Sequence, residues 1–207
     1  KINFNLPNRL ERKDILSMYY NKYKICKNVE KSDIIEKLSY NTFGFSGADI
    51  QNLFNEAAII TVRDDKNSID EKSLNDSIDY IRLGNEKKSL QLSTKERETV
   101  AVHEAGHALV SNILENVPNA VKVSIIPRTK GMLGFSESKI QEEKTLYYKE
   151  EFIDQIKVLM AGRAAEEVLL NRISSGAKDD IQSINKLLKQ MINEYGMSDT
   201  LGLLNLN

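Results

Sequence analysis

The pentapeptide His103-Glu104-Ala105-Gly106-His107 lies in a stretch whose apolar spacing predicts a helix over about residues 95–114. Residues four apart on an α-helix differ by about 40° around its axis, so both imidazoles point to the same side. Two histidine nitrogens arranged in this way can share one zinc ion at about 2 Å. Glu104 would lie beside the metal and accept a proton from bound water, whose pKa zinc lowers from about 15.7 toward 7.

Two polar residues on a helix surface are the alternative interpretation of such a motif. Here, however, both histidines of the chain fall within this one pentapeptide. The flanking residues make the helix largely apolar: Val100, Val102, Ala105, Ala108, Leu109 and Ile113. Imidazoles without partners would be poorly satisfied on such a helix, so the zinc interpretation is favoured.

A catalytic zinc site usually has three protein ligands and leaves the fourth position for water. There is no third histidine, and the single cysteine, Cys26, is interpreted as a small core residue. The third ligand should therefore be a carboxylate, and the candidates are Glu166, Glu167, Asp179 and Asp180. The glutamates could instead be surface charges or a partner of a zinc-bound histidine, and the aspartates could be helix N-caps. Spacing alone leaves all four open.

The chain before about residue 86 has the pattern of a small all-helical unit. Apolar residues recur at helical spacing after residue 9, over 33–38, after residue 46 and over about 71–81. Ser46, with Asp49 three residues later, predicts an N-cap with a capping box. Gly84 marks the end of the last of these helices. The polar stretch 85–98 is interpreted as the connection to a second domain.

The second domain is predicted to combine helices with a small β element. Residues 121–126 alternate well enough to form a strand that Pro127 closes. A loop containing Gly131 and Gly134 then leads to a second strand. Helices are expected over about 147–170 and 180–195, with Gly196 as the C-cap of the last one. The predicted fold class is therefore mainly α.

Composition excludes some classes of function and suggests a compartment. The chain has 207 residues, with 29 basic and 30 acidic side chains and a net charge of −1, which argues against general attraction to nucleic acid. A single cysteine cannot form an intrachain disulfide, which indicates a reducing compartment. No stretch approaches the roughly 20 apolar residues of a membrane helix, and no signal peptide is recognised. Because the chain does not begin with methionine, it is expected to be a fragment of a longer protein.

Several ordered motifs resemble the FtsH family of membrane-anchored, ATP-dependent zinc proteases. Residues 44–49 (GFSGAD) and 55–58 (NEAA) resemble the helical lid subdomain of the AAA module. Residues 103–107 match the peptidase motif, 125–128 (IIPR) the strand beside the active site, 162–167 (GRAAEE) the next helix and 175–180 (SGAKDD) the third-ligand segment. Residues 196–198 and 201–202 match the stretch that follows. The match is loose over the loop 129–138.

The resemblance implies a role for each site residue. It implies that Asp180 completes a zinc site with His103 and His107, and that Glu104 is the general base. It divides the chain into an AAA lid subdomain at 1–86 and a zinc metallopeptidase domain at 87–207, without the C-terminal helices usual in the family. The strand around 121–126 would lie beside the cleft, where an unfolded polypeptide substrate could pair with its main chain.

Expectations for the whole protein also follow from the resemblance. It would be a homohexameric ring that uses ATP and Mg²⁺ to degrade misfolded or regulatory proteins, with Gly47 and Ala48 near the nucleotide. It would be anchored to a membrane through an N-terminal segment outside this chain, its catalytic part in the bacterial cytoplasm or an organelle matrix. The nucleotide-binding GxxxxGK[ST] loop does not occur here, so this chain is not expected to hydrolyse ATP by itself.

A catalytically inactive family member that acts as a chaperone or assembly scaffold is the alternative function. Such members lose residues of the HExxH motif, whereas this chain keeps all of them. The sequence therefore favours the enzyme.

Overall fold

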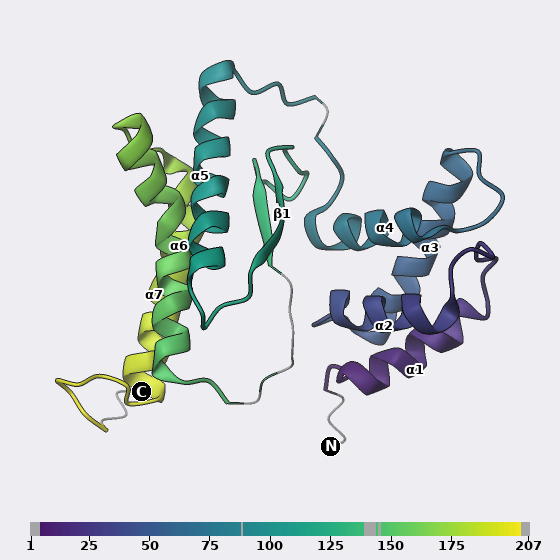
Figure 1. Ribbon diagram of the computed structural model, residues 1–207, viewed down its shortest axis with the longest axis horizontal. Helices are drawn as coiled ribbons and strands as arrows, with labels where there is room; N and C mark the ends of the chain where they lie inside the picture. The colour runs from purple at the N-terminus through teal and green to yellow at the C-terminus, as the bar shows by residue number, and fades with distance from the viewer. Residues whose placement is uncertain (1–4, 88, 139–143, 145, 204–207) are drawn as a thin grey trace. The chain divides into compact units, whose positions relative to one another are not determined.

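The computed structural model describes residues 5–87, 89–138, 144 and 146–203, which fall into two compact units, one up to Asn85 and one from Glu86 onward (Figure 1). Both units are built mainly from helices, and one two-stranded sheet is present in the described part of the chain. The predicted mainly α fold class with a small β element is therefore confirmed. Among the helices of the described residues, none combines the length and apolar character that a membrane crossing requires.

Four helices form the first unit: α1 (Arg9–Tyr20), α2 (Lys31–Asn41), α3 (Gly47–Arg63) and α4 (Glu71–Leu83). They enclose one apolar core, whose completely buried members are Leu16, Leu38, Ile50, Leu53, Phe54, Ala57 and Leu74. Each large apolar side chain buried in this way contributes about 1.5–3 kcal/mol. Helices of 11 to 13 residues, such as α1, α2 and α4, are marginal alone in water, so the shared core is what stabilises them.

The ends of α3 and α4 are set by residues that the sequence already indicates. The Asp49 backbone N–H donates to Ser46 Oγ at 3.2 Å, and the Ser46 backbone N–H donates to Asp49 Oδ2 at 2.9 Å. This is the predicted capping box, and Gly47 and Ala48 are the first two residues of the helix that it caps. Gly84 follows α4 with a φ of 79°, a backbone conformation that residues other than glycine rarely adopt.

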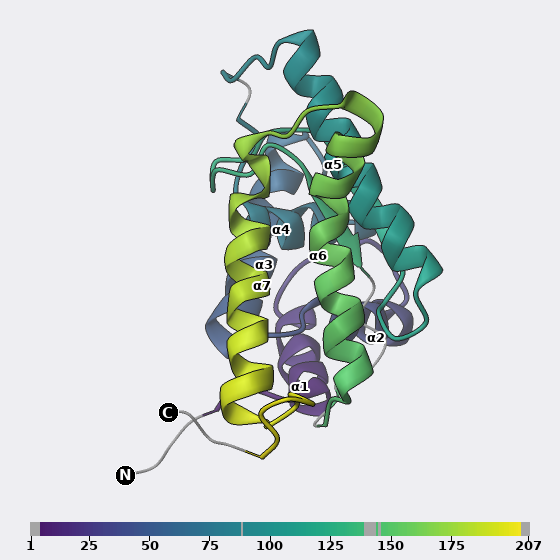
Figure 2. The ribbon, with the colours of Figure 1, turned by 90° about the vertical axis from the view of Figure 1, so that its left-hand side faces the viewer.

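Helices α5 (Thr94–Ile113) and α6 (Lys149–Leu170) lie side by side at the centre of the second unit. Strands β1 (Ala120–Ser124) and β2 (Phe135–Ser138) pair antiparallel and pack against α5. Helix α7 (Lys178–Lys189) runs along α6 (Figure 2), after the short 3₁₀ turn η1 (Ser175–Ala177) and before the π-helical turn η2 (Gln190–Glu194).

Several element boundaries differ from the prediction by a few residues, among them the end of β1 and the start of α7. The first strand ends at Ser124 and not at residue 126, because the chain beyond it pairs with the connecting segment: the Lys87 N–H donates to the Pro127 carbonyl at 2.8 Å. The last helix begins at Lys178, two residues early, because it continues directly from η1. Gly196 lies just past its π-helical end with a φ of 61°.

The two central helices approach each other closely at Gly106. A Cβ atom on Gly106 would lie 2.5 Å from the Ala161 carbonyl oxygen and 2.7 Å from Ala165 Cβ, both far inside van der Waals contact. A glycine at this position therefore lets the backbone of α6 lie directly against α5. This contact brings the residues of α6 within reach of the side chains that α5 presents.

The N-cap of α4 gives a pH-dependent contribution to stability. Asp70 accepts hydrogen bonds from Lys66 Nζ at 2.9 Å, from Ser73 Oγ at 2.7 Å and from the Ser73 N–H at 2.8 Å. The bond from Lys66, followed by those from Ser73, holds the pKa of Asp70 well below its ordinary value. A lowered pKa in the folded state stabilises the fold above the unfolded-state pKa of about 3.9, and this contribution is lost as the pH falls further.

We therefore expect Asp70→Ala to lower the free energy of unfolding by about 1 kcal/mol at pH 7, and by progressively less below about pH 4. Urea unfolding followed by circular dichroism measures both values. Asp70→Asn is the matched control, because it keeps an N-cap acceptor without the titrating charge. A deficit in Asp70→Ala that stayed constant down to pH 2 would contradict the electrostatic account.

Candidate metal centre

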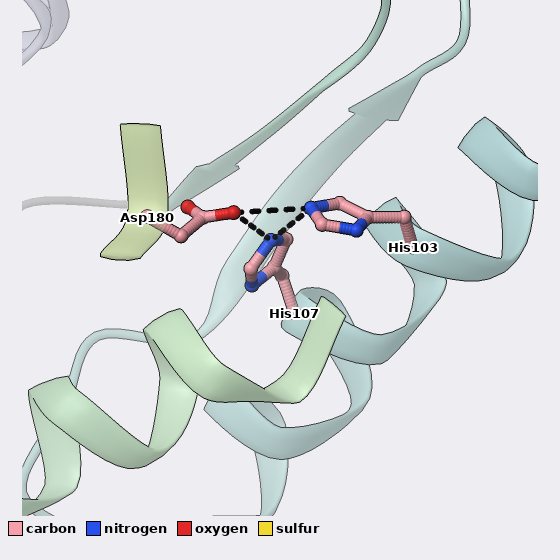
Figure 3. Close-up of side chains that lie close together, drawn as sticks. All are labelled: His103, His107 and Asp180. Carbon is pink, nitrogen blue, oxygen red and sulfur yellow. Dashed lines mark hydrogen bonds and ion pairs between the residues drawn. The ribbon is translucent and has the colours of Figure 1, made fainter. Parts of the chain in front are cut away.

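Three side chains from two helices converge in the second unit (Figure 3). His103 and His107 lie one turn apart on α5, and Asp180 lies in the first turn of α7. His103 Nε2 is 3.0 Å from His107 Nε2, and Asp180 Oδ2 is 3.1 Å from the first nitrogen and 3.5 Å from the second. In the part of the chain that the structure describes, this is the one group of histidine, cysteine and acidic side chains placed to share a metal ion.

The donor set and its spacing fit zinc. Two imidazole nitrogens and one carboxylate oxygen are ordinary zinc ligands, with bonds of about 2.0–2.2 Å in tetrahedral geometry. Ligand atoms at the corners of such a tetrahedron are about 3.3 Å apart. The observed separations of 3.0, 3.1 and 3.5 Å bracket this value. The three side chains could therefore bind zinc without a change in the fold.

The second nitrogen of each imidazole is held by α6. His107 Nδ1 lies 2.7 Å from the carbonyl oxygen of Val158, which can only accept, so Nδ1 carries the proton and donates it. His103 Nδ1 donates in the same way to Glu166 Oε1 at 2.7 Å. In the neutral form of each ring, Nε2 then has the free lone pair and faces Asp180. This tautomer is the one that a metal ligand at Nε2 requires.

The structure distinguishes among the four carboxylates that sequence spacing left open. Asp180 lies with the two histidines, whereas Glu166 lies behind His103 and is 1% exposed. Glu167 and Asp179, their immediate neighbours in sequence, are both exposed. The geometry thus makes Asp180 the candidate ligand and Glu166 the hydrogen-bond partner of His103.

Burial and hydrogen bonding shift the pKa values of the three clustered side chains in opposite directions. Burial lowers the pKa of His103, but hydrogen bonds to Asp180 and Glu166 outweigh it and raise that pKa. For His107, burial is likewise outweighed by the bonds to Asp180 and to the Val158 carbonyl, so its pKa is also raised. Burial raises the pKa of Asp180, but its bonds to both histidines hold that pKa far below the ordinary value. A metal ion binding here competes with protons.

Glu104 lies beside the cluster on α5 and is 9% exposed. Burial raises the pKa of its carboxyl group, and the neighbouring His107 and His103 oppose that rise. Gly134, just before β2, contributes to the enclosure: a Cβ atom there would lie 2.9 Å from Glu104 Cγ. A carboxylate with a raised pKa is a stronger base than an ordinary glutamate, which suits proton transfer near neutral pH.

Gly162 is a site residue whose position the sequence pattern did not reveal. A Cβ atom on it would lie 2.5 Å from His107 Nε2 and 2.6 Å from both Nε2 and Cε1 of His103. The missing side chain therefore leaves room for the two imidazoles against α6. The available signal is a glycine inside a predicted helix, which costs about 1 kcal/mol relative to alanine and calls for a packing reason. The sequence does not show what it packs against.

Comparisons with known proteins agree with this geometry. A model of the AAA+ lid domain matches residues 32–76, and a model of peptidase family M41 matches residues 90–207. The ATP-dependent zinc metalloprotease FtsH of Halothermothrix orenii is 42% identical over 200 residues, which are 97% of this chain and 31% of that protein. FtsH 3 of Petrotoga mobilis, which bears the same description, is 38% identical over 202 residues, or 98% of this chain and 31% of that protein.

The ATP-dependent zinc metalloprotease FtsH of Clostridium perfringens is 40% identical over 193 residues, covering 93% of this chain and 26% of that protein. The chain therefore spans less than a third of the length of these curated relatives. The M41 model covers more than half of this chain and includes the whole cluster of His103, His107 and Asp180. The chain belongs to peptidase family M41.

Proposed function

We propose that this chain is the lid and peptidase part of an ATP-dependent zinc endopeptidase, with the lid at 1–86 and the peptidase domain at 87–207. The observation that carries the proposal is the cluster of His103, His107 and Asp180, whose donor atoms have the spacing of a tetrahedral zinc site. The names of the relatives and the match to family M41 support it.

Each side chain of the site has a defined task in this proposal. A zinc ion held by His103, His107 and Asp180 would supply Lewis-acid chemistry: it would polarise the scissile carbonyl and lower the pKa of bound water from about 15.7 toward 7. His103 and His107 would bind it through Nε2, because their Nδ1–H groups are held by Glu166 and the Val158 carbonyl. Glu104 accepts the proton of the attacking water and donates it to the leaving amine as the peptide bond breaks.

The proposed substrate is an unfolded polypeptide that adds to the edge of the small sheet. The sheet packs against α5, the helix that carries the motif, and β1 has β2 as its one strand partner within the described residues. The outer part of β1 is accessible, with Val121 60% and Val123 46% exposed. Main-chain pairing does not depend on side-chain identity, so it suits the degradation of proteins with many different sequences.

The wider assembly belongs to the same proposal. The relatives are named ATP-dependent zinc metalloproteases, which supports ATP dependence of the whole protein. The proposed whole protein is an ATP- and Mg²⁺-driven hexamer that degrades misfolded or regulatory membrane and soluble proteins, with Gly47 and Ala48 near the nucleotide. A membrane anchor outside this chain would hold the catalytic part in the bacterial cytoplasm or an organelle matrix.

The adjacent aspartates provide a test of the ligand set. We expect about one zinc per chain in the wild-type protein and in Asp179→Ala, and a large loss of zinc in Asp180→Ala, because only the second aspartate contacts the histidines. Elemental analysis after zinc repletion and removal of free metal measures the content. Full zinc retention by Asp180→Ala would redirect the assignment to Glu166 or Glu167.

The proposed base has a separate test. In the full-length protein with ATP, Glu104→Gln should keep its zinc and lose casein degradation by at least about 100-fold, because the amide cannot accept the proton. The exposed Glu167→Gln is the control and should behave as the wild type. Activity that survives in Glu104→Gln would show that another group is the base. A wild-type protein that binds zinc but degrades nothing would favour the scaffold function.

A side chain at Gly162 is expected to affect zinc binding more than the stability of the fold, because it would displace the two imidazoles. Gly162→Ala should change the thermal stability of the metal-free protein little, because the helix preference of alanine, about 1 kcal/mol, offsets the cost of moving the imidazoles out of their hydrogen bonds. The displaced rings should weaken zinc binding by about 10-fold or more, measured by competition with a chelator. Unchanged zinc affinity would show that the site does not depend on this close approach.

A further inference from the structure

The buried carboxylate of Glu166 has two protein partners in the described residues. Its Oε1 accepts from His103 Nδ1 at 2.7 Å and from Ser174 Oγ at 3.1 Å, and its Oε2 accepts from the Ser174 backbone N–H at 2.7 Å. Burying a carboxylate is costly unless hydrogen bonds satisfy it. Ser174 therefore provides two of the three hydrogen bonds that allow Glu166 to lie 1% exposed behind the histidine.

Ser174 also fixes the segment that leads into α7. It is the N-cap of the turn η1, and its Oγ accepts the N–H of Gly176 at 3.1 Å. The turn ends at Ala177, which is 2% exposed, and α7 begins at the next residue with Asp180 in its first turn. One serine hydroxyl is thus bonded both to the carboxylate behind His103 and to the turn that precedes Asp180.

We propose that Ser174 is a positioning residue of the metal centre. Through Glu166 it holds the His103 ring in the orientation that directs Nε2 toward Asp180. Through η1 it holds the start of α7, so that the Asp180 carboxylate stays within about 3 Å of the same nitrogen. This inference rests on the proposed zinc site. Ser174 is not itself a ligand, but it couples the positions of two ligands, His103 on α5 and Asp180 on α7.

Removal of the hydroxyl should loosen both connections while leaving the fold intact. Ser174→Ala keeps the backbone N–H that donates to Glu166 Oε2, so the buried carboxylate retains that bond and the one to His103. Changes to groups that orient metal-bound histidines typically weaken metal binding by about 10- to 100-fold. We expect a loss of about 10-fold in zinc affinity for Ser174→Ala.

The experiment compares zinc affinity, by competition with a chelator, in the wild-type protein, Ser174→Ala, Ser174→Thr and Ser175→Ala. Ser175 is the matched control because it is exposed and directly adjacent. Ser174→Thr keeps the hydroxyl and should restore binding. The absorption spectrum of the Co²⁺-substituted protein should change in Ser174→Ala and stay as in the wild type for Ser175→Ala. All four metal-free proteins should be folded by circular dichroism, and thermal unfolding of Ser174→Ala should show only the modest destabilisation expected from loss of the hydroxyl hydrogen bonds.

A double-mutant cycle tests whether Ser174 acts through Glu166. In a Glu166→Gln background, Ser174→Ala should cause a smaller loss than in the wild type, because only the connection through η1 remains to be broken; fully additive losses would contradict the coupling through Glu166. Wild-type affinity and spectrum in Ser174→Ala, or a loss that accompanies unfolding of the metal-free protein, would overturn the inference. A wild-type protein that binds no zinc would overturn the proposed function as well, whereas one that binds zinc without peptidase activity would leave the role of Ser174 standing.

Discussion

The close antiparallel contact between α5 and α6 is the constraint on which the rest of the site depends. Gly106 brings the α6 backbone against α5, and Gly162 leaves the space in which the two imidazoles lie. The same helix then provides the Val158 carbonyl and the Glu166 carboxylate that fix the far nitrogens of both rings. If α5 and α6 lay farther apart, the two imidazoles would no longer be enclosed or held by α6, although each helix could still form.

The third side chain reaches the site by a different route. Asp180 is 77 residues from His103 along the chain, and it is positioned by the turn η1 and by the packing of α7 on α6. Glu166 joins the two parts, since one carboxylate bonds to His103 of α5 and to Ser174, the N-cap of η1. Buried charges are tolerated here because each has partners, and the same partners hold the geometry that a metal ion would use.

Much of this architecture follows from local sequence rules, and the remainder depends on contacts between distant residues. Helical periodicity predicts the helices and places His103 and His107 on one face, and the capping box at Ser46 sets the start of α3. Spacing could not choose among four carboxylates, because the strand pair lies between them and the motif, and α6 and η1 also precede the two aspartates. Only the family resemblance indicated Asp180. The strand ended early because residues 127–128 pair with residues 86–87. Gly106 and Gly162 are needed because each faces the opposing helix at close range, and the local sequence pattern does not show which residues lie opposite.

The decisive measurement is anomalous diffraction at the zinc absorption edge from crystals of the zinc-loaded protein. We predict one strong peak within about 2.0–2.2 Å of His103 Nε2, His107 Nε2 and an Asp180 carboxylate oxygen, with Glu166 still hydrogen-bonded to His103 Nδ1. A peak bonded to Glu166, or no peak at this cluster after full loading, would contradict the assignment of these three side chains as the metal centre.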